Sequence, residues 1–174
     1  MRTIKFTAAA AIAAVAMYAA TGNRQVTSNA KSPSAETSMM VNGKNVTIEY
    51  NAPSAHDRKV EGGLIPYDGI YRFGADAATT LTTDTDLMIG DLHVPKGVYT
   101  LYLQANEKGP WLLAVNRQTK QWGTVYNKDQ DLGRTMMKVT KLDSKVDKFN
   151  LTLANGMLTM EWGNTKATVP VKGM

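Results

Sequence analysis

The sequence predicts an all-β protein, a single-domain antiparallel β-sandwich, with a small β-barrel as the alternative. Three observations predict this class. Short segments alternate apolar and polar residues with a period of two, as half-buried strands do. Turn-forming Gly, Pro and Asn residues separate these segments at regular spacing. After residue 40, no segment of adequate length has the 3.6-residue period of an amphipathic helix.

About nine or ten short strands are predicted in chain order. The clearest are 46–50, 78–82, 86–89, 98–103, 111–115, 136–140, 149–153, 158–162 and 167–171. Gly90-Asp91 and Pro95-Lys96-Gly97 have the composition of tight turns. Asn155-Gly156, between two predicted strands, is the strongest hairpin signal in the chain.

Residues 1–22 are predicted to be an export signal peptide. Arg2 and Lys5 form a basic start, and residues 6–20 are almost wholly apolar. An apolar run of about 15 residues is short for a permanent span, which needs about 20. Cleavage is expected after Ala14-Val15-Ala16 or after Ala20-Thr21-Gly22. The expected location is therefore periplasmic or extracellular, with no permanent membrane span.

Residues 23–40 are rich in Ser, Thr, Asn, Ala and Gln, and have neither hydrophobic period. This composition predicts a flexible linker before a folded domain over residues 41–174. The alternative is an N-terminal strand that docks on a neighbouring molecule. A mature chain of about 150 residues suffices for one hydrophobic core and is short for two.

Charge and cysteine content narrow the classes of function. The formal net charge is +5, from 20 Lys and Arg against 15 Asp and Glu. Removal of Arg2 and Lys5 with the signal leaves 18 against 15, a net charge of +3. These charges are interspersed, so we expect no nucleic-acid partner, because such binding needs a basic stripe. The absence of cysteine excludes disulfides, thiol nucleophiles and cysteine metal ligands.

The sequence contains no recognisable catalytic or cofactor motif. There is no Gly-x-Ser-x-Gly elbow, His-Glu-x-x-His pair or Walker-type glycine loop. His56 and His93 are the only histidines, and a metal site usually needs a third or fourth spaced donor. We therefore predict no metal, no cofactor and no catalytic residues.

Two pairs of carboxylates have a spacing that resembles a calcium loop. Asp84 and Asp86 lack the glycine and the later glutamate of an EF-hand, and are interpreted as a polar turn. Asp129 and Asp131 follow Lys128 and are interpreted as part of a solvated loop.

The only polar constellation that resembles a binding site comprises Tyr67, Arg72, Asp76 and Trp122. Arg72 lies between two aromatic residues, where a guanidinium can stack and still present its planar donors. Gly74 would allow close approach of a ligand. Asp76 could accept from a sugar hydroxyl, and Trp122 could supply a stacking surface. The alternative is structural, with an Arg72–Asp76 ion pair that fixes a loop and Trp122 capping the core.

Several blocks resemble one family of exported bacterial domains of unknown function, DUF2911. The blocks are Tyr50-Asn-Ala-Pro-Ser, Arg58-Lys-Val-Glu-Gly-Gly-Leu-Ile-Pro-Tyr, Tyr71-Arg-Phe-Gly-Ala-Asp, Pro95-Lys-Gly-Val-Tyr-Thr-Leu and Gln121-Trp-Gly. The resemblance covers about residues 45–171, in the family's order, and implies a compact, secreted, mainly β domain with no established activity. The family commonly has Trp-Arg-x-Gly-Ala-Asn where this chain has Tyr71 first and Asp76 last.

The sequence therefore predicts an exported domain that binds a small ligand or a glycan without catalysis. The first alternative is a structural or assembly role, through exposed sheet edges or residues 23–40. The second is a hydrolase that uses carboxylates alone, which would need two acids facing each other across a cleft.

Overall fold

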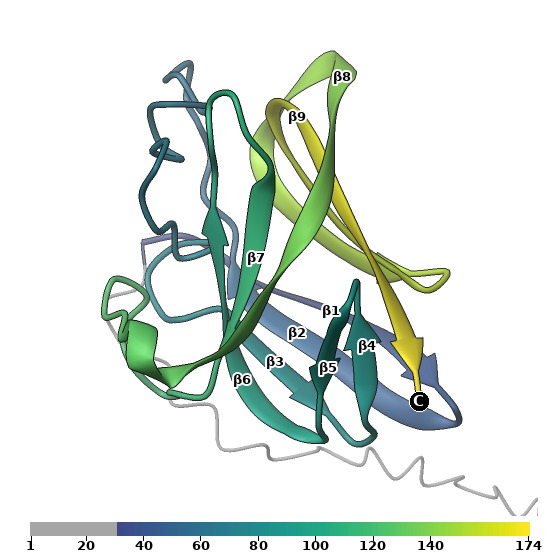
Figure 1. Cartoon of the computed structure of the whole chain (residues 1–174). Helices are drawn as coiled ribbons and strands as arrows, with labels where there is room; N and C mark the ends of the chain where they lie inside the picture. The colour runs from purple at the N-terminus through teal and green to yellow at the C-terminus, as the bar shows by residue number, and fades with distance from the viewer. Residues whose placement is uncertain (1–30) are drawn as a thin grey trace, which may run out of the picture.

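The computed structural model describes residues 31–174, which form nine strands in one antiparallel sheet (Figure 1). The strands are β1 (Ser34–Val41), β2 (Lys44–Asn51), β3 (Thr80–Thr83), β4 (Leu87–Ile89), β5 (Leu92–Val94), β6 (Gly97–Gln104), β7 (Trp111–Asn116), β8 (Asp131–Ala154) and β9 (Met157–Gly173). Their order in the sheet is β1-β2-β3-β6-β7-β8-β9-β4-β5. A single turn of 3₁₀ helix, η1 (Lys128–Gln130), precedes β8. The predicted all-β, antiparallel architecture is confirmed; the predicted signal peptide lies outside the described residues.

The sheet curls over itself because its longest strand bends. The register between β8 and β9 shifts twice, between Lys141 and Val146 and between Val146 and Asn150. Such irregularities bend a strand and increase its twist. The second half of β8 therefore crosses back over the inner side of β1 and β2 (Figure 1). There, the Leu151 amide donates to the Tyr50 hydroxyl at 3.1 Å, and the Leu153 amide donates to Thr37 Oγ1 at 2.8 Å.

The core fills the space between the two layers of this curled sheet. Residues of β2, β6 and β7 that face inward, such as Ile48, Leu101 and Leu113, are almost completely buried. At the end near the β8 bend, Phe149 makes edge contacts with the rings of four aromatic residues. These are Tyr50, Tyr71, Phe73 and Trp162, at centroid distances between 5.5 and 6.3 Å. Aromatic burial of this kind contributes the largest apolar areas per residue.

The bulges also explain why several predicted strands are longer than expected. The predicted strands 136–140 and 149–153 are both parts of β8, and 158–162 and 167–171 are both parts of β9. The apolar alternation fades in the middle of β8, where the strand is exposed. The predicted Asn155-Gly156 turn joins β8 to β9.

Strand β1 corrects the prediction of a flexible linker over residues 23–40. Residues 34–40 pair with β2 along their whole length. The connection is the two-residue turn Asn42-Gly43, with φ angles of 50° and 72°, which is a typical hairpin turn. Side chains of β1 alternate between exposed and half-buried. One side of the strand therefore packs on the core, although its residues do not form a clear apolar pattern in the sequence. The linker prediction is therefore wrong for residues 34–40, and the domain begins before residue 41.

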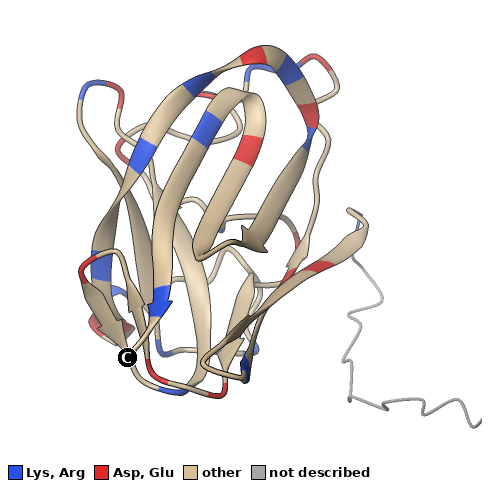
Figure 2. Ribbon diagram, turned by 90° about the vertical axis from the view of Figure 1, so that its right-hand side faces the viewer, with Lys and Arg blue, Asp and Glu red and all other residues tan. Residues whose placement is uncertain are grey.

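The surface carries mixed charge. Figure 2 shows basic and acidic positions interspersed along the long strands β8 and β9. Within residues 31–174, no helix is long and apolar enough to cross a membrane.

Candidate functional site on the outer face of the sheet

The outer face of β6, β7 and β8 is polar, because its side chains alternate with those of the core. Cross-strand pairing places these outward residues in two adjacent rows. The rows are Thr100–Asn116–Asp131 and Tyr102–Ala114–Arg134. Most of these positions are nevertheless buried, so something must cover them.

Residues 117–130, which we name the outer loop, cover this face. Thr100 Oγ1 donates to the Gln118 carbonyl at 2.7 Å, and the Tyr102 hydroxyl donates to the Val125 carbonyl at 2.6 Å. The ring of Tyr126 lies edge-on to that of Tyr102, with centroids 4.9 Å apart. The outer loop is therefore held against the sheet by side chains of the sheet itself.

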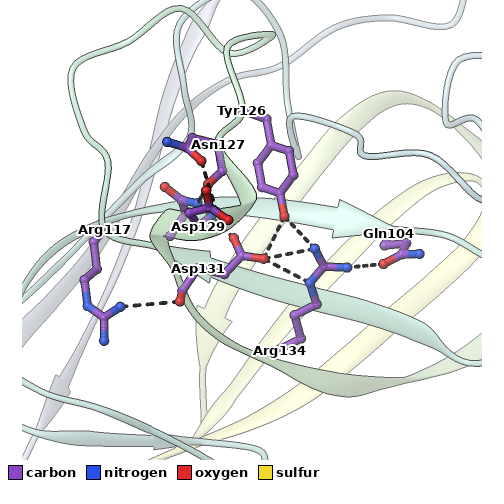
Figure 3. A network of polar contacts seen from close by, with 8 residues as sticks. Gln104, Arg117, Tyr126, Asn127, Asp129, Asp131 and Arg134 are labelled. Carbon is purple, nitrogen blue, oxygen red and sulfur yellow. Dashed lines mark hydrogen bonds and ion pairs between the residues drawn. The ribbon is translucent and has the colours of Figure 1, made fainter.

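A polar network completes this attachment (Figure 3). Arg134 donates to Asp131 Oδ2 through Nε at 3.0 Å and through Nη2 at 2.9 Å. The Tyr126 hydroxyl donates to the same oxygen at 2.7 Å, and Asn116 Nδ2 donates to Asp131 Oδ1 at 2.8 Å. Arg134 also contacts Gln104 Oε1 and the Tyr126 hydroxyl. The side chains of Asp131 and Arg134 are only 12% and 24% exposed.

The network keeps Tyr126 protonated. Burial and the hydrogen bond to the Asp131 carboxylate raise the pKa of Tyr126 to about 12. The hydroxyl therefore stays protonated, and able to donate to Asp131, to a higher pH than in a free tyrosine.

The central role of Asp131 contradicts the prediction of a solvated loop for Asp129 and Asp131. Asp129 is exposed in η1, in agreement with the prediction. Asp131 differs because the β7–β8 register shifts beside Asn116, which turns Asp131 and Arg134 to the same face. Residues three apart on a regular strand would face opposite sides. No pattern in the sequence signals this bulge.

Of the four predicted site residues, Asp76 faces the chain's own backbone. Its side chain is buried, and Oδ2 accepts from the backbone amides of Lys31 and Ser32 at 2.9 and 2.8 Å. Asp76 therefore fixes the segment that enters β1. Among residues 31–174, the structure contains three ion pairs of Lys or Arg with an acid and one His93–Asp86 contact, and an Arg72–Asp76 pair is not among them.

Arg72 lies against Gly123, the residue that follows Trp122. Trp122 pairs with Ala77 through an antiparallel bridge, and the Gly123 amide donates to the Asp76 carbonyl at 2.9 Å. A Cβ atom at Gly123 would lie only 2.9 Å from Cδ of Arg72. The aliphatic part of Arg72 thus packs on Gly123, directly beside Trp122 in the chain. Both side chains are partly exposed.

The side-chain N–H groups of Arg72 and Trp122 are used differently from those of the other described arginines and tryptophans. Within the described chain, neither the Arg72 guanidinium nor the Trp122 indole N–H has a hydrogen-bond partner. The other three arginines of residues 31–174 all donate to oxygen atoms of the protein: Arg58, Arg117 and Arg134. The indole N–H groups of the two buried tryptophans donate to backbone carbonyls: Trp111 at 3.1 Å and Trp162 at 2.8 Å.

Tyr67 lies two residues along β6 from the Tyr71–Leu103 bridge. It bridges to Ala105 at the end of β6, and its ring lies against Gly62 and the edge of the core. No hydrogen bond, bridge or aromatic contact among residues 31–174 joins it to Arg72, Asp76 or Trp122. The structure therefore places Arg72 against the residue that follows Trp122, and no such contact among residues 31–174 joins Tyr67 to either of them.

Two clefts lie away from these residues. One of about 330 Å³ opens between β1 and β8, and is lined by Ala35, Tyr50, Ala52, Lys148, Phe149 and Asn150. The other, of about 220 Å³, is charged and is lined by residues 57–61, Lys145, Gly163 and Asn164. Residues 31–174 contain no group of three or more His, Cys, Asp or Glu side chains that could hold a metal ion.

Comparison with family models gives one match, to "Protein of unknown function (DUF2911)", over residues 32–171. The chain belongs to this family. No curated protein and no solved structure matches it. The family match begins at residue 32, so the family's domain includes β1, as the structure does.

The fold assigns a structural role to the first aromatic residue of the DUF2911 block that begins at Tyr71. Tyr71 is buried beside Trp162 with ring centroids 6.1 Å apart, and its hydroxyl donates to the Gly74 carbonyl at 2.8 Å. Burial raises the pKa of Tyr71 well above its usual range. In this DUF2911 domain, the alternating block therefore sends Tyr71 to the core and leaves Arg72 on the outside.

Proposed function

We propose that this DUF2911 domain is an exported, non-catalytic binding module for a glycan. Its contact surface would be Arg72 and Trp122, which we name the Arg72–Trp122 shelf. The observation that carries the proposal is the pair of unused donors. In the part of the chain that the structure describes, every other arginine and tryptophan side chain donates at least one hydrogen bond to the protein, and Arg72 packs on the residue that follows Trp122.

The chemistry of the shelf suits a sugar. An indole face offers a flat apolar surface for a pyranose ring, and a guanidinium offers planar donors to neighbouring oxygen atoms. The shelf is also held in place before any ligand arrives. Backbone bridges fix residues 122 and 123, and the Tyr126–Asp131–Arg134 network fixes the outer loop. Preorganisation of this kind reduces the entropic cost of binding.

The test is a binding screen of the chain against immobilised polysaccharides, with Trp122→Ala and Arg72→Gln as variants. We expect each variant to weaken binding at least about tenfold, as for loss of a central contact. Lys108→Gln is the matched control, because Lys108 is an exposed basic residue outside the outer loop. Unchanged binding in Trp122→Ala would overturn the proposal. A large fall in melting temperature for Arg72→Gln would instead identify Arg72 as a structural residue.

Export is a separate part of the proposal. N-terminal sequencing of the protein recovered from outside the cytoplasm should begin at residue 17 or 23, after one of the two predicted cleavage sites. An N-terminus at Met1 in the recovered protein would contradict it.

Self-assembly is the second candidate function, and the position of β1 favours it. In the sheet order, β1 is a terminal strand with a paired neighbour on one side only. Such an edge can add a strand from another molecule. Sedimentation should then detect a dimer that Ser38→Pro abolishes, because proline cannot donate to a ladder. A monomer at all concentrations would count against this function.

A further inference from the structure

The charges around the Arg72–Trp122 shelf point to one class of glycan. Two buried or half-buried acids lie on the segments that build the shelf and anchor the outer loop, and both are engaged within the protein. Asp76 accepts from the backbone amides of Lys31 and Ser32. Asp131 accepts from Arg134 and Tyr126. Neither carboxylate has an ion pair with Arg72.

The outer loop, which contains Trp122, carries a net positive charge. It contains three basic residues and one acid, all exposed: Arg117, Lys120, Lys128 and Asp129. Lys120 lies two residues before Trp122 and has a positive φ of 66°, so a local turn leads directly into the shelf. A ligand beside Trp122 would therefore meet a guanidinium that no carboxylate of residues 31–174 contacts, next to a loop of net positive charge.

We infer that the shelf selects acidic glycans, in which a uronate carboxylate binds Arg72 while the sugar ring stacks on Trp122. This inference rests on the proposed function and specifies its ligand. A carboxylate matches the planar donor fork of arginine, and such charge-assisted bonds are roughly twice as strong as neutral ones. A neutral sugar could use the indole face but would leave the Arg72 charge unpaired. A uronate supplies both features in one residue.

Single-stranded nucleic acid also combines rings with negative charge, but it fits the surface less well. Binding to such chains needs a basic groove that follows the backbone over several nucleotides. Basic and acidic residues are interspersed on the long strands (Figure 2), and the shelf offers a single unengaged guanidinium among residues 31–174. Nucleic acid is therefore an alternative outcome of the test and not the proposal.

The test compares polygalacturonate with the same polymer after methyl esterification, which masks the carboxylates and keeps the rings. Affinity electrophoresis or calorimetry with the chain should give at least about tenfold stronger binding to the acid form, and the advantage should shrink as salt rises. Arg72→Gln should reduce binding to the acid form to the level of the ester. Arg72→Lys should retain part of the preference, and Trp122→Ala should weaken binding to both polymers.

The outcomes separate the two proposals. Equal affinity for the acid and the ester, with both lost in Trp122→Ala, would overturn the acidic selectivity and leave the glycan-binding function standing. Failure to bind any acidic or neutral polysaccharide would overturn both. Stronger binding to single-stranded DNA than to polygalacturonate would replace the glycan with a nucleic acid. An unchanged acid preference in Arg72→Gln would overturn the role of Arg72.

Discussion

Arg134 lies on the outer face of β8 and Arg72 lies in the segment between β2 and β3, each beside an aromatic residue, yet their donors are used differently. Arg134 donates to Asp131, Tyr126 and Gln104. Arg72 has no such partner within residues 31–174, because Asp76, the nearest acid that follows it in the chain, is committed to the backbone of residues 31 and 32. The comparison shows that the partners within reach, and not the residue type, decide whether an arginine stabilises the fold or is left for a ligand.

The two regions are also connected through the outer loop. The Arg134 network holds one part of the loop against the sheet, and Trp122 belongs to another part of the same loop. The hydrogen-bonded network around Arg134 thus holds in place the loop that carries Trp122, whose own N–H has no partner among residues 31–174. Variants in the first region should change the stability of the fold, whereas variants in the second should change binding.

The largest effect is expected for Arg134→Ala. Its removal leaves the Asp131 carboxylate, 12% exposed, without its cation. Fully buried pairs lose 3–5 kcal/mol in this way and exposed pairs lose little, so a half-buried network should lose about 2 kcal/mol. Urea unfolding measures the change. The matched control, Arg117→Ala, should cost less than about 0.5 kcal/mol. Equal losses in the two variants would show that the network does not stabilise the fold.

Gly123→Ala tests the contact on which the shelf is built. The new Cβ would lie 2.8 Å from the Asp76 carbonyl oxygen and 2.9 Å from Cδ of Arg72. Because the first atom belongs to the backbone, the contact cannot relax by a side-chain rotation alone. Overpacking of this kind costs about 1–3 kcal/mol, and we expect about 1–2 kcal/mol here by urea unfolding. Thr124→Ala, at the next, exposed position, is the control and should be nearly neutral.

Much of the fold follows from local patterns in the sequence. Strict alternation predicts β6, and the Asn155-Gly156 turn predicts the β8–β9 hairpin, because both signals act between neighbouring residues. The sequence does not predict β1, because the inner side of this strand is only half-buried and its stability comes from pairing with β2. Two predicted strands form the single strand β8 because bulges allow the strand to bend, and these bulges correspond to no pattern in the sequence.

The candidate site also combines features that local sequence patterns predict with features that depend on distant residues. The place of Arg72 between two aromatic residues predicts a binding residue, and in the fold its side chain packs on Gly123, the residue that follows Trp122. The role of Asp76 depends on amides more than 40 residues earlier in the chain, at positions 31 and 32. The Asp131–Arg134 pair depends on a register shift. Long-range partners of this kind require the three-dimensional structure.

Two variants of Asp76 distinguish the effect of its charge from the effect of its hydrogen bonds. Both amides donate to the same oxygen, Oδ2, so a single carbonyl oxygen could accept both bonds. Asp76→Asn, the residue common in the family's block, should therefore cost less than about 0.5 kcal/mol. Asp76→Ala should cost about 1 kcal/mol, because it leaves two partly buried amides without an acceptor. Hydrogen exchange at Lys31 and Ser32 should accelerate in Asp76→Ala only; acceleration in both variants would show that the charge is essential.

The smallest effect is a pH dependence of the loop-holding network. The pKa of Tyr126 is raised to about 12, mainly by burial and then by its bond to Asp131, whereas an unfolded tyrosine titrates near 10. A raised tyrosine pKa means that folding favours the neutral hydroxyl, so this contribution is complete below pH 10 and is lost between about pH 10 and 12. At neutral pH, Tyr126→Phe should cost about 1 kcal/mol, the typical value of one hydrogen bond. Urea unfolding of both proteins from pH 8 to 12 should show this gap constant at first and then shrinking as the pH rises. A gap that stays constant to pH 12 would mean that Tyr126 titrates alike in the folded and unfolded states, and that its hydroxyl is not held by Asp131.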